Sequence, residues 1–282
     1  MNSILLRFPN GAAKALTLSY DDAVTEDIRL IAIMQKHGLK GTFNINTSQY
    51  ISPDFSYPPE KKWGRRMTEA EATALYSQEG VEPALHGYTH SVLSSQPPAQ
   101  VVYEVMKDRD HLESQFGKIV RGMAYPFGAY NDSVLSCLKS CGIAYCRTTK
   151  ETHRFDLPAD WLCWHPTCHH NDPMLFELAQ KFLKEDRSTW LTPRVFYLWG
   201  HAYEFEQKEN WDRIEKFAAE MGDRDDIWYA TNIEIYEYVE AFRQLVFTLD
   251  ERIVTNPTAT AVRFYLKDVL YTIEPGETRR LF

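Results

Sequence analysis

The stretch ALTLSYDDAVTEDIRLIAIMQKHGLKGTFNIN, residues 15–46, contains one complete strand–helix–strand unit. Residues 15–20 form an apolar run typical of a buried strand, and residues 25–38 carry apolar side chains at helical spacing up to a glycine. The residues that follow this glycine form a second apolar strand. Two neighbouring acids, Asp21 and Asp22, stand where the first strand ends. Because such pairs are common at turns and helix N-caps, their meaning depends on the rest of the chain.

The same alternation of strand-like and helical segments continues to about residue 240, and we count seven or eight βα units. It predicts parallel strands with crossover helices, and the number of units favours an α/β fold of the distorted (β/α)7-8, TIM-like barrel type. An open, doubly wound sheet is the alternative. We predict that residues 1–243 form one barrel. Residues 244–282 contain short β-type segments with Asn-Pro and Pro-Gly turns, which predict a small β appendage packed on the barrel.

The composition narrows the choice of partner and compartment. A formal net charge of −8 and a pI of 5.6 argue against nucleic acid and against an anionic membrane as partner, because both require concentrated Lys and Arg. The count of five cysteines is odd, and the first residues contain no apolar run long enough for a signal peptide. We therefore expect reduced thiols and a cytoplasmic protein.

Polar side chains recur at the carboxyl ends of the expected strands. In a parallel barrel these ends open on one face, where the loops build active sites. The concentration of polar residues there favours a functional site over ordinary solvation. The residues concerned are Asp21, Asp22, Asn44, Asn46, His86, Tyr125, Arg147, His201, Thr231 and Asn232.

The segment LHGYTHS contains two histidines, His86 and His90, directly after an apolar run. Because the two histidines are four residues apart, a helical turn would place both rings on the same side. Two imidazoles and one carboxylate, with a fourth position for water, form the ligand set of a catalytic zinc site. Asp22 is the candidate carboxylate, and a bound cation would relieve its repulsion with Asp21, leaving Asp21 ionised as a base. A pair of hydrogen-bonded or surface histidines is the alternative interpretation.

Five motifs together resemble the polysaccharide deacetylases of carbohydrate esterase family 4. SYDDA stands where that family has TFDDG, HGYTH where it has HTxxH or HSxxH, and AYPFG where it has RPPYG. ADW lies near the place of DxxDW, and LWGH near that of LLH. The five motifs occur in the family's order between residues 19 and 201. The resemblance implies a metal-dependent hydrolase on a distorted barrel of βα units.

The resemblance also implies a role for individual residues. Asp21 would be the general base, and His201 would be the general acid that protonates the leaving group. The backbone NH of Phe127, next to Tyr125, would stabilise the oxyanion. The metal ligands would be Asp22, His86 and His90.

Two departures from the family's motifs require substitutes. Ala124 occupies the place of the arginine in RPPYG, which orients the base in the family, and Arg147 is our preferred replacement ahead of Arg121. Leu157 occupies the place of the first aspartate in DxxDW. This leaves Asp160, or else Asp156, to orient His201 and raise its pKa. Two further motif positions differ, because Ala23 replaces a glycine and Gly87 replaces a hydroxyl residue.

The remaining aromatic and histidine clusters receive smaller roles. Trp63 lies in a Pro-rich polar loop, where burial does not explain it, and could offer a sugar ring a flat apolar platform. The segment WHPTCHHND, residues 164–172, contains His165, His169 and His170. Its spacing lacks the regularity of a dedicated metal site, so we expect a pocket-lining loop or a structural cluster.

The sequence therefore predicts a carbohydrate deacetylase that hydrolyses an N-acetyl amide or O-acetyl ester. The expected cofactor is one divalent metal ion, zinc in the first place, although cobalt or nickel would accept the same ligands. The expected substrate is an acetylated sugar or oligosaccharide. Two alternatives stay open: a metal-independent hydrolase of cyclic amides or ureides on the same barrel, and a non-catalytic carbohydrate-binding barrel.

Overall fold

The computed structural model describes residues 4–184 and 192–282 of the chain. Within these residues, a central sheet of eight strands has only parallel neighbours. Hydrogen bonds connect its strands in the order β6-β5-β4-β3-β2-β8-β7, and β9 pairs with the first half of β2. The strands are β2 (Lys14–Asp21), β3 (Gly41–Ile45), β4 (Val81–Leu85), β5 (Gly122–Ala124), β6 (Tyr145–Arg147), β7 (Cys168–His169), β8 (Arg194–Gly200) and β9 (Ile227–Tyr229).

The sheet curls until its two edges meet through residues 164–170. On one edge, the backbone NH of Trp164 donates to the carbonyl of Cys146 in β6 at 3.0 Å. Directly before the edge strand β7, the NH of Thr167 donates to the carbonyl of Tyr197 in β8 at 2.8 Å. The segment that contains β7 therefore joins β6 to β8, and this confirms the predicted α/β fold of the distorted barrel type.

The helices begin and end at residues whose side chains suit those positions. Thr68 and Glu71 form a capping box at the start of α2, and Thr231 and Glu234 form another at the start of α9. Gly117 ends α3 with φ of 62°, a left-handed conformation that glycine adopts without a steric penalty. The helices are α1 (Asp27–Lys36), α2 (Glu69–Tyr76), α3 (Pro98–Phe116), α4 (Asp132–Ser140), α5 (Leu175–Leu183), α7 (Tyr203–Gln207), α8 (Trp211–Met221) and α9 (Asn232–Arg243).

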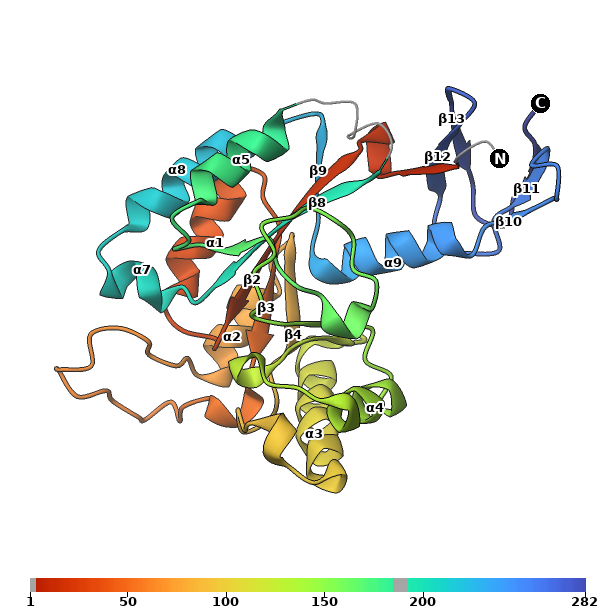
Figure 1. Ribbon diagram of the computed structural model, residues 1–282. Coiled ribbons are helices and arrows are strands. Elements are labelled where there is room, and N and C mark those ends of the chain that lie inside the picture. The colour runs from red at the N-terminus through yellow and green to blue at the C-terminus, as the bar shows by residue number, and fades with distance from the viewer. Residues whose placement is uncertain (1–3, 185–191) are drawn as a thin grey trace.

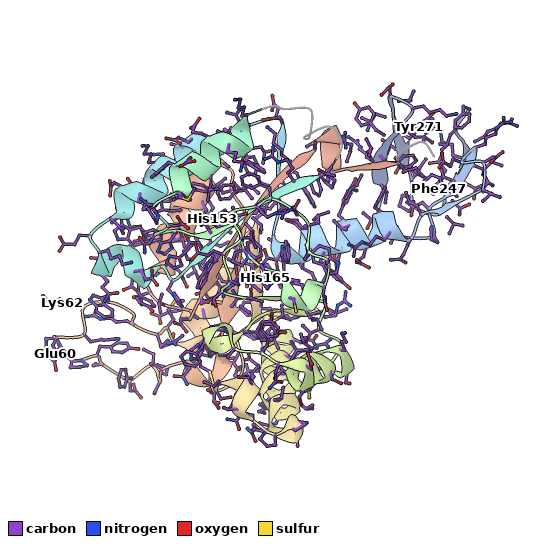
Figure 2. All side chains as sticks on the ribbon, in the orientation of Figure 1. Glu60, Lys62, His153, His165, Phe247 and Tyr271 are labelled. Atoms are coloured by element: carbon purple, nitrogen blue, oxygen red, sulfur yellow. The ribbon has the colours of Figure 1, made fainter. Side chains whose placement is uncertain are left out.

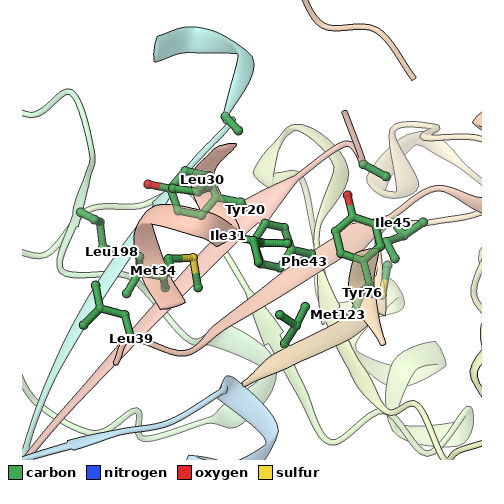
Figure 3. Close-up of a cluster of buried hydrophobic side chains, with 14 of the residues drawn as sticks. Tyr20, Leu30, Ile31, Met34, Leu39, Phe43, Ile45, Tyr76, Met123 and Leu198 are labelled. Carbon is green, nitrogen blue, oxygen red and sulfur yellow. The ribbon is translucent and has the colours of Figure 1, made fainter. Parts of the chain in front are cut away.

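The main core lies between the sheet and these helices. Figure 1 shows α1, α5 and α8 gathered on one side of the strands and α3 and α4 on another. The rings of Tyr20 in β2 and Phe43 in β3 stack with their centroids 6.2 Å apart. The centroids of Phe43 and Tyr76 of α2 lie 5.3 Å apart. Leu30 and Met34 of α1 complete this cluster (Figure 3). Each buried large apolar side chain stabilises the fold by about 1.5–3 kcal/mol, so these contacts fix α1 and α2 beside the strand ends.

Two small antiparallel sheets lie beyond the end of α9 (Figure 1). One contains β10 (Val246–Phe247), β11 (Ile253–Thr255) and β14 (Thr278–Arg280). The other contains β1 (Leu5–Arg7), β12 (Val262–Leu266) and β13 (Val269–Ile273), so the first strand of the chain pairs with the C-terminal segment. The boundary at residue 243 stays a prediction. In the described part of the chain, none of the helices combines the length and the apolar character needed to cross a membrane.

Candidate functional site

The polar residues at the strand ends meet on one face of the barrel. Asp21 is the last residue of β2, and Arg147 is the last residue of β6. His86 directly follows β4, and His201 directly follows β8. The C-terminal ends of parallel strands lie on the same side of a barrel, which explains how residues so distant in the sequence come together.

The Asp21 carboxylate is buried and held on both oxygens. Asn44 donates to Oδ1 at 2.8 Å, and Arg147 donates to Oδ2. The Nε2 atoms of His86 and His201 lie 3.7 and 3.8 Å from Oδ2. Burial opposes the charged carboxylate, but Arg147 and the two histidines outweigh burial and lower the pKa of Asp21 to about 2. Asp21 is therefore ionised at neutral pH.

Asp22 reaches the same site because the backbone turns sharply after β2. Asp22 has φ of 85° and Ala23 has φ of 50°, both in the left-handed region where side chains other than glycine are strained. Asp22 Oδ2 lies 3.9 Å from Nε2 of His201, so the side chains of the two neighbouring acids face one place. Ala23 thus adopts the backbone conformation that explains a glycine at this position of the family's motif.

Asp22, His86 and His90 form a group that could hold a metal ion, with one ligand atom from each lying within 4.8 Å of the others. The Nδ1 atom of His86 is 2.9 Å from the carbonyl of Ala124, so Nδ1 carries the proton and Nε2 keeps its lone pair for a metal. Burial lowers the pKa of His86, and it lowers the pKa of His90 to about 4. Both imidazoles are therefore neutral at pH 7, and the donor set fits a divalent ion of the zinc type.

Arg66, which the sequence analysis did not identify, also contacts this group. Its guanidinium donates to Asp22 Oδ1 at 2.9 Å. Burial opposes ionisation of Asp22, but the Arg66 charge and the nearby histidines lower its pKa overall. Arg66 comes from the irregular loop of residues 51–66, which projects from the barrel with Glu60 and Lys62 at its tip (Figure 2). Periodicity says nothing about the path of such a loop.

Asp108 of α3 is a second residue that the sequence analysis missed. Its carboxyl group is fully buried and accepts from the backbone NH of His86 at 3.1 Å. It also accepts from the backbone NH and the hydroxyl of Thr47 at 3.0 and 2.7 Å. Asp108 therefore connects α3 to the loops after β3 and β4 and fixes the backbone that carries His86.

The partner of His201 is Glu204, and the prediction that Asp160 or Asp156 orients His201 is wrong. Glu204 Oε1 lies 3.0 Å from His201 Nδ1. Asp160 instead accepts from the backbone NH of Leu162 at 2.9 Å, in a local cap. Asp156 accepts from Arg154 at the surface. Burial opposes protonation of His201, but Glu204 and the two site aspartates outweigh burial and raise its pKa.

Glu204 also contacts three other side chains, from the segment of residues 164–172 that was predicted to be a pocket-lining loop or a structural cluster. Its Oε2 accepts from Asn171 at 2.8 Å and lies 3.3 Å from His169 Nε2 and 3.2 Å from His170 Nε2. The NH of Asn171 donates to His169 Nδ1 at 3.1 Å, so Nδ1 is an acceptor and Nε2, which faces Glu204, carries a proton. This arrangement suits a hydrogen-bonded network better than a metal ion. The spacing of Glu204 three residues after His201, on one helical turn, is the signal that could have identified it.

Arg147 occupies the position expected for the replacement of the missing motif arginine. It is fully buried, donates to Asp21 and lies over the ring of Trp199 at 4.5 Å. Arg121, the weaker candidate, lies 3.8 Å from Glu237 instead. The guanidinium of Arg147 therefore reaches Asp21 from β6, although alanine occupies the motif position in β5.

The three residues predicted to contact substrate or oxyanion differ in their exposure. Tyr125 is buried and donates its hydroxyl to the carbonyl of Leu162 at 2.9 Å, so its side chain faces the interior and not a substrate. Phe127 is 64% exposed, and its ring contacts His90 at 4.6 Å. The ring of Trp63 stacks on that of Tyr203, with the ring centroids 6.0 Å apart. The ring centroids of Tyr203 and His201 lie 5.3 Å apart. Phe127 and Trp63 thus lie at the edge of the site, and their roles stay predictions.

Comparison of the sequence with known proteins agrees with the motifs. The sequence model of the polysaccharide deacetylase family matches residues 9–146. This range contains Asp21, Asp22, His86 and His90, whereas His201 lies beyond it. A search among curated proteins gives no match. The resemblance stated from the motifs is therefore confirmed for the first half of the barrel.

Solved structures share the fold at low sequence identity. A protein from Mycobacterium smegmatis assigned to the polysaccharide deacetylases has a TM-score of 0.58 at 17% identity, with 88% of this chain and 98% of that chain covered. A mutant of a CE4 family pseudoenzyme from Bacillus anthracis, with restored enzymatic activity, has a TM-score of 0.50 at 16% identity, covering 82% and 70%.

A deacetylase from Streptococcus pyogenes in complex with acetate is 23% identical, with a TM-score of 0.40. The alignment covers 47% of this chain and 55% of that chain, so the chain spans little more than half the length of this relative. The likeness to the Mycobacterium smegmatis and Bacillus anthracis structures shows a shared fold, which is the curled barrel of parallel strands described above.

Proposed function

We propose that the chain, whose residues 9–146 match the sequence model of the polysaccharide deacetylase family, is a metal-dependent hydrolase that removes an acetyl group from a carbohydrate. One observation carries the proposal. The ionised Asp21 carboxylate lies 3.7 Å from a candidate metal ligand, His86, and 3.8 Å from a candidate acid, His201. A base, an acid and a set of metal ligands are what hydrolysis of an amide or ester requires.

Three residues would hold the ion, namely Asp22, His86 and His90. Their fit rests on the neutral state of both imidazoles and on the proton that His86 keeps on Nδ1. A bound divalent ion supplies Lewis-acid chemistry, which lowers the pKa of water and polarises an acyl oxygen. Zinc suits this ligand set, and cobalt or nickel would also be accepted.

The chain's own residues supply the proton transfers. Asp21 accepts a proton from the attacking water, because Arg147 keeps its carboxylate charged and fixes one of its oxygens. His201 protonates the leaving group, because Glu204 raises its pKa and so extends its protonated range toward neutral pH. The backbone NH of Phe127 is our candidate for the donor that stabilises the oxyanion.

The proposed substrate is an acetylated sugar or oligosaccharide. Trp63 and Tyr203 stack beside His201 and could present a flat apolar surface to a sugar ring. Both an N-acetyl amide and an O-acetyl ester are compatible with the proposed base and acid. The cytoplasmic location and the exclusion of nucleic acid and membrane as partners stay predictions from the sequence.

Proteins with this fold include a pseudoenzyme, so the fold alone does not establish an activity. Two alternatives are a metal-independent hydrolase of cyclic amides or ureides and a non-catalytic carbohydrate-binding barrel. The metal-independent hydrolase would not need Asp22, His86 and His90 in one group. The binding barrel would need neither a charged base nor a paired acid, and both are present in Asp21 and His201.

Release of acetate tests the proposal directly. The full chain, stripped with a chelator and dialysed, is assayed on a panel of N-acetylated and O-acetylated sugars with and without added Zn²⁺, Co²⁺ or Ni²⁺. We expect acetate release only with metal. His201→Ala should lower turnover by about 10²–10⁴-fold without loss of bound metal, whereas His111→Ala on α3 should change neither. Full activity in metal-free protein contradicts the mechanism, and tight sugar binding without acetate from any substrate contradicts the function.

A further inference from the structure

A second group of metal-ligand side chains lies outside the proposed site, and it contains Glu151, His153 and Asp172. One ligand atom from each residue lies within 4.8 Å of the others. His153 Nε2 is 2.6 Å from Asp172 Oδ2, and the two carboxyl groups are in hydrogen-bonding contact. Figure 2 labels His153 on the loop that precedes residues 164–170. None of these residues is among those proposed for deacetylation.

The charges in this group are not balanced. Within residues 4–184 and 192–282, the ion pair formed by the two carboxylates is the one between Asp172 and His153. Arg213 is nearby, but its guanidinium donates to the carbonyl oxygens of His170 and Asp172. The ligand atoms of the two carboxylates lie within 4.8 Å of each other, so a divalent cation between them would neutralise both.

Backbone groups hold both carboxylates in place. The NH of His169 donates to Glu151 Oε2 at 2.9 Å, and the NH of Met174 donates to Asp172 Oδ1 at 2.7 Å. The other oxygen of Asp172, Oδ2, faces His153. The other oxygen of Glu151, Oε1, takes no part in these backbone hydrogen bonds. The NH of His153 donates to the carbonyl of Thr167 at 2.9 Å. Such outer contacts orient ligands in metal sites.

We propose that Glu151, His153 and Asp172 form a second site for a divalent transition-metal ion of the zinc type. One imidazole nitrogen and two carboxylate oxygens suit such an ion, with water completing the coordination. The ion would connect the loop of residues 151–153 to the segment of residues 164–172, which joins β6 to β8. Its expected role is therefore to stabilise the barrel closure, and the proposal does not depend on the proposed function.

The zinc content of the full chain tests this site. Protein is dialysed against a zinc-buffered solution and its bound zinc is measured. We expect two ions per chain in the wild type, one in Glu151→Gln, one in His153→Asn, one in Asp22→Asn, and none in Asp22→Asn/Glu151→Gln. The substitutions are mild, because Gln keeps an acceptor for the His169 NH and Asn tolerates the φ of 53° at position 153. Asp156→Asn, at a nearby exposed acid, should keep both ions.

The outcomes separate this inference from the proposed function. One ion that Asp22→Asn removes and Glu151→Gln leaves overturns the second site, while the proposed metal site stands. One ion with the opposite dependence supports the second site and contradicts the proposed deacetylase centre. Thermal unfolding gives an independent readout, because zinc should raise the Tm of Asp22→Asn but not that of the double variant. No zinc-dependent change in the Tm of Asp22→Asn also overturns the second site.

Discussion

The guanidinium of Arg147, at the end of β6, donates a hydrogen bond to the carboxylate of Asp21, at the end of β2. Three strands lie between β6 and β2 in the sheet order, so the contact crosses the interior of the barrel. Both side chains are almost fully buried, with 0% and 3% exposed. The pair therefore supplies the charge that the alanine at position 124 cannot provide.

Arg147→Gln should damage both stability and activity. Removal of one partner leaves a buried carboxylate without its cation, which typically costs about 3–5 kcal/mol of unfolding free energy. The pKa of Asp21 should also rise, because Arg147 is the largest of the effects that lower it. The acid limb of the pH–rate profile should then move to higher pH. Arg147→Lys should lose less stability and activity than Arg147→Gln. Arg121→Gln at the surface is the matched control. An unchanged acid limb in an otherwise folded Arg147→Gln variant would mean that Asp21 is not the base.

Glu204→Gln should lower the pKa of His201. Glu204 is the largest of the effects that raise this pKa, and glutamine keeps an acceptor for Nδ1 but removes the charge. Because the general acid works in its protonated form, activity is lost as pH rises through the pKa of His201. The alkaline limb of the pH–rate profile should therefore move to lower pH. Asp160→Asn should leave this limb in place, and the reverse result would restore Asp160 as the orienting residue.

The sequence was sufficient for the barrel and for the residues carried by local motifs. Asp21 and Asp22 stand at a strand end, and His86 and His90 directly follow another strand, so periodicity and parallel pairing bring them to one face. Arg147 was also identifiable, because β6 ends there. In each case the relevant fact was the position of a residue at the end of a regular element.

The errors and omissions concern residues whose place depends on irregular backbone. The side chain of Asp160 accepts a hydrogen bond from the NH of Leu162 in its own turn. This local hydrogen bond competes with a longer-range contact between Asp160 and His201. Tyr125 directly follows the short strand β5, but its hydroxyl donates to the internal carbonyl of Leu162 and its ring is buried. Arg66 lies in a long loop whose path depends on tertiary contacts. The periodic spacing of apolar residues does not predict such a path.

Arg66→Gln should tighten metal binding at the proposed centre. The guanidinium lies 2.9 Å from Asp22 Oδ1, so its positive charge opposes a cation held by Asp22. We expect the zinc affinity of the Asp22 site to rise roughly tenfold, which equals about 1.4 kcal/mol. Competition with a chelating indicator measures the affinity, and Arg65→Gln is the control. A weaker affinity would show that Arg66 chiefly orients Asp22.

The buried Asp27 should make the stability of the fold decrease as pH rises. Its Oδ2 accepts from the hydroxyl of Tyr76 at 2.6 Å and from the NH of Val24 at 3.2 Å. Burial raises the pKa of Asp27 to about 8, although these hydrogen bonds oppose the shift. Between about pH 4, where the unfolded carboxyl ionises, and pH 8, the folded state binds a proton that the unfolded state releases. The unfolding free energy therefore falls with pH across this window.

Asp27→Asn should remove this part of the pH dependence, because an amide resembles the protonated carboxyl group and keeps an acceptor for Tyr76. One pKa unit corresponds to about 1.4 kcal/mol, so the difference between wild type and variant should grow by about 1.4 kcal/mol per pH unit from pH 5 to 7. Denaturant unfolding at pH 5, 6, 7 and 8 measures the difference, with the exposed Asp54→Asn as control. Parallel curves for wild type and Asp27→Asn would show that Asp27 ionises normally in the folded protein and that the turn carrying Asp22 tolerates a buried charge.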